Sequence, residues 1–177
     1  APVLADTSSY LSMAPAGSGG FGRGLALYDG VVYVGGNNGM LYSLAAPDGS
    51  AEFQQVLEAA VTQGAFAAGP VAVSTGSGGG AIVFSGQQGG SNSIWVYDLA
   101  TTDLVQIDTD QLLVTQLIVD EHGVLYAAGN PGADFGQVYA IRIDAVLQQE
   151  RDFVVDSELM QDFDEPASGQ LTVTPRY

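Results

Sequence analysis

One histidine and many carboxylates are the side chains in this chain that could do chemistry. The 177 residues include 20 Asp and Glu, a single His and no Cys. A Ser-His-Asp triad would have to use His122, which precedes Gly123 in a polar run typical of a turn. A single His excludes a multi-His zinc site, and the lack of Cys excludes thiol catalysis and thiolate metal sites. We therefore predict no catalytic residue and no enzymatic activity.

Carboxylates spaced two apart are the remaining candidates for acid–base work or for a cation site. Asp108 and Asp110 flank one residue, and in a strand this spacing would put both on one face, where the pKa of one would rise. In a loop both would stay solvated. A Ca²⁺ ion needs several oxygen ligands, but no stretch matches the EF-hand loop. The acidic residues near the C-terminus that could supply such ligands are Asp156, Glu158, Asp162 and Asp164. We predict no cofactor and no metal site, with Ca²⁺ as the alternative.

Two glycine-rich runs and the only tryptophan have structural interpretations. The runs 76–80 and 86–90 are not phosphate-binding loops, since the chain has no Lys and neither run ends in the required Gly-Lys-Ser/Thr. We interpret both as loops between strands. Trp95 lies in an apolar, strand-like run, and we predict that it is packed within a sheet.

The charge limits the partners. A net charge of −16 repels nucleic acid and anionic membrane surfaces, and no apolar run is long enough to insert into a membrane. The N-terminal Ala1-Pro2-Val3 lacks the basic and apolar regions of a signal peptide, and we interpret it as a processed end or an engineered boundary. The lack of Lys and the high acidity favour an extracellular or cell-surface protein.

Short alternating strands and Gly-rich turns dominate the pattern of elements. Residues 31–35 and 40–44 alternate in hydrophobicity, and Asn38-Gly39 between them is a strong hairpin signal, because both residues tolerate positive φ. This unit recurs twice. Aligning the second strands 32–36, 82–86 and 125–129 gives offsets of 50 and 43 residues, which is the spacing of propeller blades with four strands each.

The third strands of the three units carry tyrosines. We predict that Tyr42, Tyr97 and Tyr139 take the same place in three like sheets. The fold class is therefore all-β, a β-propeller-like array of about three four-stranded antiparallel blades, and with only three blades a partial propeller. The predicted divisions are an irregular N-terminal segment 1–23, blades 24–62, 63–111 and 112–156, and an acidic linker with a final strand, 157–177. Within the linker, the spacing of Leu159, Met160 and Phe163 predicts one turn of helix; the final strand is 170–174, and 153–155 is the fourth strand of the third blade.

The first unit resembles a blade of the PQQ-like, or quinoprotein dehydrogenase-like, β-propeller repeat superfamily. The resemblance rests on an apolar strand, Asp-Gly, Val-Tyr-Val-Gly, a turn and Gly-x-Leu-Tyr-x-Leu within 24–49, and extends to 69–103 and 115–144. It implies blades and no particular function, because such blades occur in enzymes, scaffolds and surface proteins. The family's enzymes bind the quinone and Ca²⁺ with a Trp platform, adjacent cysteines and an Asp base. No such residue can be carried over, since Cys is absent and Trp95 lies in a strand.

We therefore predict a non-catalytic interaction or structural module. The alternatives are a carbohydrate-binding, lectin-like propeller and a fragment of a quinoprotein-like enzyme. The partner is a protein or a glycan, and incomplete closure favours a homo-oligomer or completion by another propeller segment. The loops 35–39, 86–93 and 129–136 would form the recognition surface, although each polar residue there also suits a turn. The predicted ligand-binding residues are Asn37, Asn38, Gln87, Gln88, Asn92, Asn130 and Asp134.

Overall fold

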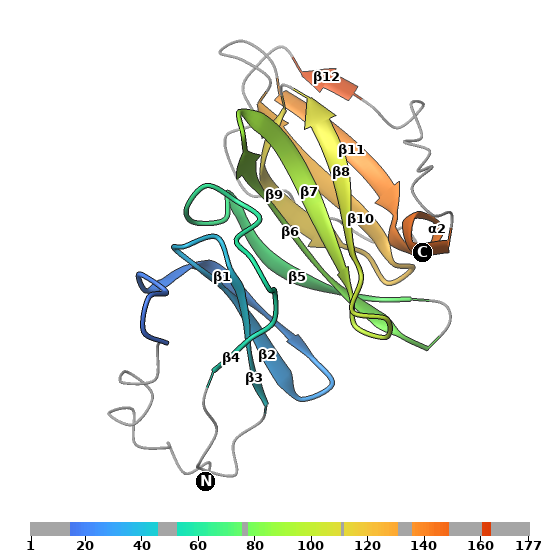
Figure 1. Ribbon diagram of the computed structural model, residues 1–177. Coiled ribbons are helices and arrows are strands. Elements are labelled where there is room, and N and C mark those ends of the chain that lie inside the picture. Colours follow the sequence, from blue (N-terminus) through green and yellow to red (C-terminus); the bar gives the residue numbers. More distant parts are fainter. Residues whose placement is uncertain are drawn as a thin grey trace, which may run out of the picture.

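Three β-sheets follow one another along the chain (Figure 1). The computed structural model describes residues 15–45, 53–75, 78–110, 112–130, 136–148 and 161–163. Each sheet has four strands, neighbouring strands are antiparallel, and the strand order in each sheet follows the chain. The prediction of an all-β chain with three four-stranded antiparallel sheets is confirmed.

Two tight turns shape the first sheet. Sheet 1 consists of β1 (Phe21–Tyr28), β2 (Val31–Gly36), β3 (Leu41–Ala45) and β4 (Gln54–Gln55). Asp29 and Gly30 join β1 to β2 with positive φ angles of 46° and 75°, as a two-residue hairpin turn requires. The hairpin predicted at Asn38-Gly39 is present, but of these two residues only Gly39 has a positive φ, 79°. The Asn38 side-chain oxygen instead accepts a hydrogen bond from the Met40 N–H at 3.2 Å, which closes the turn.

The other two sheets repeat this order. Sheet 2 consists of β5 (Ala68–Ser74), β6 (Gly80–Gln88), β7 (Ser91–Asp98) and β8 (Leu104–Asp110). Sheet 3 consists of β9 (Leu113–Val119), β10 (Val124–Asn130), β11 (Gly136–Arg142) and β12 (Gln161–Phe163), and the helix α2 (Ile143–Gln148) directly follows β11. The helical turn predicted around Phe163 is wrong for residues 161–163, because these form β12 and pair with β11. The fourth strand of sheet 3 is β12 and not 153–155, as was predicted. Residues 153–155 and 170–174 lie outside the described residues, and β1 begins inside the segment 1–23 that was predicted to be irregular.

The sheets contact one another in sequence order through their first strands. β5 packs beside β1 and also beside β9. Residues opposite each other on antiparallel strands point to the same face, so Ile82 and its partner Tyr97 share one face of sheet 2, while Val83 and its partner Val96 share the other. The first face belongs to an apolar core shared with sheet 1, and the second to a core shared with sheet 3. In each sheet we call the face on the side of the preceding sheet the upstream face, and the face on the side of the following sheet the downstream face.

This sandwiched position explains the sequence of sheet 2. In β6, the four consecutive residues from Ala81 to Phe84 are all fully buried, as are Ile94 and Val96 of β7. A strand covered on both faces has a continuous apolar sequence rather than an alternating one. Trp95 belongs to the core between sheets 1 and 2 and is 6% exposed, so the prediction that it is a packed residue is confirmed.

The predicted equivalence of three tyrosines is only partly correct. The strand pairs are Tyr42 with Val34, Trp95 with Phe84, Tyr97 with Ile82, and Tyr139 with Ala127. With the second strands aligned as predicted, Trp95 occupies the place that Tyr42 and Tyr139 hold in their own sheets. The prediction is wrong for Tyr97, which lies two residues farther along its strand, although on the same upstream face. The two alignments made from the sequence could not both hold, because the β6–β7 hairpin fixes which residues face each other.

Candidate functional site

Asn37 and Asn38, predicted to bind a ligand, hold the β2–β3 turn to the preceding segment. The Asn37 Nδ2 donates a hydrogen bond to the Gly19 carbonyl at 2.9 Å. The Asn38 Nδ2 donates to the Gly17 carbonyl at 3.1 Å and to the Tyr42 hydroxyl at 2.8 Å. Both amides are therefore used in contacts within the chain, as the turn-forming interpretation of these residues requires.

The prediction of a loop over 86–93 is wrong for Gln87, Gln88 and Asn92, because β6 extends to Gln88 and β7 begins at Ser91, so that only residues 89–90 form the turn of the β6–β7 hairpin. Gln87 pairs with Asn92 across the hairpin, and both glutamines are exposed whereas Asn92 is buried. The segment that links sheets 1 and 2 connects this hairpin to the β2–β3 turn: the Val61 N–H donates to the Gly39 carbonyl at 3.1 Å, and the Gln63 N–H donates to the Gln87 carbonyl at 2.7 Å. The structure thus brings the two predicted loops to one edge, with this link between them.

The predicted residues of the third loop are described only in part. Asn130 ends β10, where its backbone is opposite Leu113 of β9. Its side chain and the whole of Asp134 lie outside the described residues. The structure therefore leaves the contribution of this loop as a prediction.

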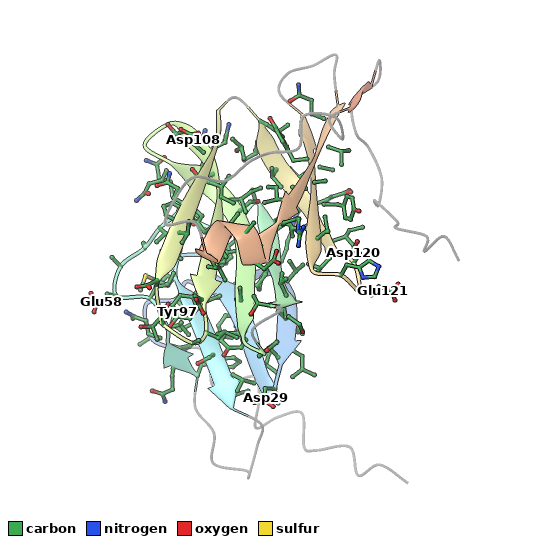
Figure 2. The ribbon with its side chains drawn as sticks, turned by 90° about the vertical axis from the view of Figure 1, so that its right-hand side faces the viewer. Asp29, Glu58, Tyr97, Asp108, Asp120 and Glu121 are labelled. Carbon is green, nitrogen blue, oxygen red and sulfur yellow. The ribbon has the colours of Figure 1, made fainter. Side chains whose placement is uncertain are left out.

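A cleft between sheets 1 and 2, at the other end of these strands, is a concave feature formed by described residues. Its volume is about 610 Å³. We call it the tyrosine cleft, and it is lined by Tyr28, Asp29, Val31, Tyr33, Gly78, Gly79, Gly80, Leu99 and Ala100. Figure 2 shows Asp29 at one end of the molecule and Asp108, near the opposite hairpin, at the other. None of the residues predicted to bind a ligand lines this cleft.

The hairpin β1–β2 and the start of β6 position the two tyrosines. The Tyr28 hydroxyl donates a hydrogen bond to the Gly79 carbonyl at 2.8 Å and so joins sheet 1 to sheet 2. The Tyr28 ring lies directly against Gly80, at a point where a Cβ atom would overlap it. Tyr33 is opposite Ala26 on β1, which puts its ring on the downstream face of sheet 1, toward sheet 2. The cleft is therefore built on strands and on one inter-sheet hydrogen bond.

Burial disfavours ionisation of the Tyr33 hydroxyl group in the cleft. Burial raises the pKa of Tyr33 above its ordinary value of 10.0, and the nearby Tyr97, Asp29 and Tyr28 raise it further. Burial also raises the pKa of Tyr97, with a contribution from Asp98. A neutral phenol donates a hydrogen bond at neutral pH, so Tyr33 together with the Asp29 carboxylate offers a donor and an acceptor beside aromatic and aliphatic surface.

His122, Asp108 and Asp110, the residues considered for chemistry from the sequence, lie in a turn and in a strand. The His122 N–H donates to the Asp120 carboxylate at 2.9 Å in the β9–β10 turn, and the His122 side chain is exposed, so the prediction of a turn residue is confirmed. Asp108 and Asp110 are opposite Ser93 and Asn92, which are consecutive in β7, so a register irregularity separates the two carboxylates. The expectation from simple strand alternation, that they share one face, does not hold across such an irregularity.

The described residues contain no group of three or more side chains suited to hold a metal ion. Of the four acidic residues proposed as Ca²⁺ ligands, only the Asp162 backbone, in β12, is described. In the same part of the chain, no helix is long and apolar enough to cross a membrane.

The sequence beside the Asp29-Gly30 turn contains a signal for the cleft, but none of the residues that carry this signal was among the predicted ligand-binding residues. Tyr28-Asp29 and Tyr33 flank this turn, and aromatic residues beside a carboxylate at a strand end are typical of a binding surface. The partner of the turn, the loop at 78–80, lies about fifty residues away, and only the inter-sheet packing brings the two together. No protein family, curated protein or solved structure matches this chain.

Proposed function

We propose that this chain is a non-catalytic, propeller-like interaction module that associates through the upstream face of sheet 1. The observation that supports this proposal is the exposure of Leu25 and Leu27 on β1, 66% and 63% respectively. They are opposite Val34 and Val32, and so lie on the face of sheet 1 that points away from sheet 2. Large apolar side chains left in water on one strand face are typical of an interaction site.

In sheets 2 and 3, the side chains at the positions equivalent to Leu25 and Leu27 pack against a neighbouring sheet. Ala72, opposite Ile82, lies against the core between sheets 1 and 2, and Leu117 and Val119 of β9 lie against the core between sheets 2 and 3. In each case the preceding sheet supplies the covering side chains. Burying apolar area contributes about 25 cal/mol per Å², so covering Leu25 and Leu27 in the same way would favour association. The acidity of the chain supports an extracellular or cell-surface setting for this module.

Cysteine labelling tests whether the sheet 1 face is open. The chain has no native Cys, so Leu25→Cys gives a single thiol, and its neighbour Ala26→Cys gives a matched control on the buried face. We expect fast labelling of Leu25→Cys in dilute solution and slow labelling of Ala26→Cys. Equally slow labelling of both variants at a concentration where the chain has a single-chain mass would mean that the chain covers this face by itself, and the proposal would be wrong.

A second candidate function, carbohydrate binding, is favoured by the tyrosine cleft. A sugar ring stacks on aromatic and aliphatic surface and exchanges hydrogen bonds with carboxylate and hydroxyl groups, and the cleft contains both kinds of group. The Asp29 carboxylate in the lining favours a neutral sugar over an anionic one. Titration with a panel of neutral hexoses, followed by NMR, should shift the resonances of Tyr33 and Gly78 and should have a smaller effect on Asp29→Asn. Shifts confined to Gln87 and Gln88, or no shifts, would contradict this candidate.

A further inference from the structure

We propose that the upstream face of sheet 1 is covered by the downstream face of sheet 3 of a second copy of the chain, so that two chains close into one ring of six sheets. This inference rests on the proposed function, because it names the partner of the face that we propose to be an interaction site.

The two inter-sheet contacts within the chain provide the pattern for this interface. In both, the downstream face of one sheet packs on the upstream face of the next. Tyr33 of sheet 1 shares a core with Ile82 of sheet 2, and Val83 of sheet 2 shares a core with Leu125 of sheet 3. Both contacts are apolar and run beside the first strands β1, β5 and β9.

Two sheet faces have no such neighbour among the described residues. One is the upstream face of sheet 1, where Leu25 and Leu27 are exposed although Val34 and Tyr42 on the same face are buried. The other is the downstream face of sheet 3, where Ile118 is opposite Tyr126 and Leu113 is opposite Asn130. Ile118 and Tyr126 are only half-buried and belong to neither core.

The exposed leucines point to the same two faces. In the described part of the chain, three large apolar side chains are exposed: Leu25, Leu27 and Leu113, the last at 37%. Leu25 and Leu27 lie on the first free face, and Leu113 lies on the second. No such residue is exposed elsewhere within the described ranges, so the apolar surface left in water gathers where the pattern of sheet packing is interrupted.

A second copy of the chain carries the required partner for each free face. The sheet 3 face of one copy can pack on the sheet 1 face of the other, and the same contact made twice closes a two-fold ring. Three sheets from each copy make six, which lies within the range of about four to eight blades seen in closed propellers. Because each chain carries a charge of −16, repulsion opposes this contact at low salt, and we expect added salt to strengthen it.

The test is the solution mass, measured by light scattering over a range of protein concentrations. We expect twice the 18.2 kDa of one chain. Leu25→Arg and Leu113→Arg each add one positive charge at an exposed position on one of the two faces, and each should give a single-chain mass. Thr101→Arg makes the same change in charge at an exposed position between β7 and β8 of sheet 2, away from both faces, and should leave the dimer intact. Circular dichroism checks that the variants fold.

Mixing the two variants distinguishes this arrangement from other dimers. A mixed pair has one undamaged contact, between the sheet 1 face of Leu113→Arg and the sheet 3 face of Leu25→Arg, so the mixture should regain dimers that neither variant forms alone. A different result is a wild-type dimer that is dissociated by Leu25→Arg but not by Leu113→Arg. This result would overturn the pairing with sheet 3 and would leave the proposed function standing.

The remaining outcomes are also decisive. A mass that grows without limit would overturn the closed ring. A single-chain mass at every concentration would overturn the second copy as partner, and the labelling of Leu25→Cys then tells whether the proposed function fails with it. Slow labelling in that case would mean that another segment of the same chain covers the face.

Discussion

Gly69 of β5 lies directly against the backbone of Arg23 in β1, so closely that a Cβ atom on Gly69 would overlap the Arg23 carbonyl oxygen. The next residue of β1, Gly24, has a φ of 73° and also contacts Gly69. Sheets 1 and 2 therefore meet backbone to backbone at this point, and glycine is needed because any side chain would push the two first strands apart.

Gly69→Ala should destabilise the fold by about 1–3 kcal/mol, because the added methyl group has no room between the two backbones. Gly22→Ala is the matched control in β1, since its Cβ would lie 3.5 Å or more from its neighbours. Urea unfolding of both variants measures the difference. Equal stability of the two variants would show that β1 and β5 do not approach each other in this way.

The Ser85 hydroxyl joins sheet 2 to sheet 3. It donates a hydrogen bond to the Val114 carbonyl at 2.6 Å and accepts one from the Ala68 N–H at 3.0 Å. Ser85→Ala should lower the free energy of unfolding by about 1–3 kcal/mol, because it removes a buried partner from both backbone groups. Ser91→Ala, at an exposed position of the same sheet, should have little effect. An unchanged stability of Ser85→Ala would count against the contact between these sheets.

Asn38→Ala separates the structural role of this residue from the ligand-binding role predicted from the sequence. The variant loses three hydrogen bonds, to Gly17, Met40 and Tyr42. At about 0.5–1.5 kcal/mol for each hydrogen bond, with partial exposure lowering the total, we expect a loss of about 1–3 kcal/mol in thermal or urea unfolding. A variant with wild-type stability would favour the ligand-binding role instead.

Stability should fall in alkaline solution because of three tyrosines. Burial raises the pKa of Tyr33, Tyr97 and Tyr126 above 10.0, and for Tyr126 the charge of Asp120 and a hydrogen bond to it add to the effect. A group whose pKa is higher in the folded state favours folding in its protonated form. Its contribution is complete below pH 10 and is lost as the pH rises through the folded-state pKa values.

Urea unfolding from about pH 8 to about pH 11 measures this loss. Tyr33→Phe and Tyr97→Phe should each make the alkaline decline less steep, and comparison of the same variants at neutral pH separates the titration from any packing change. An identical slope in the wild type and both variants would contradict the assignment to these residues.

Local turn chemistry made the repeated hairpins predictable from the sequence. Asp29-Gly30 and Asn38-Gly39 carry their signal within a few residues, and the alternation around them gives the strands. The register irregularities in β1 and β8 gave no such signal, and the one in β8 breaks the simple alternation on which the face of Asp108 and Asp110 had been predicted. The tyrosine alignment failed for a similar reason, since the pairing of β6 with β7 decides which residue takes each place.

The candidate sites were hard to predict because they depend on how the sheets pack. Phe66, in the link between sheets 1 and 2, lies against Gly35 and stacks on Phe84 with ring centroids 4.2 Å apart. Nothing within a few residues of Phe66 indicates either contact. The tyrosine cleft and the exposed face at Leu25 likewise exist only because one sheet does or does not cover the next.

Three like sheets that pack in series, joined beside their first strands, are the basis of both the proposed function and the proposed ring. NMR of the isotope-labelled chain tests this arrangement most directly, through nuclear Overhauser effects that join different sheets. We predict cross-peaks between the α protons of Gly24 and Gly69, and between the side chain of Ser85 and the backbone of Val114. Spectra that contain the expected contacts within each sheet but lack both of these inter-sheet cross-peaks would contradict it.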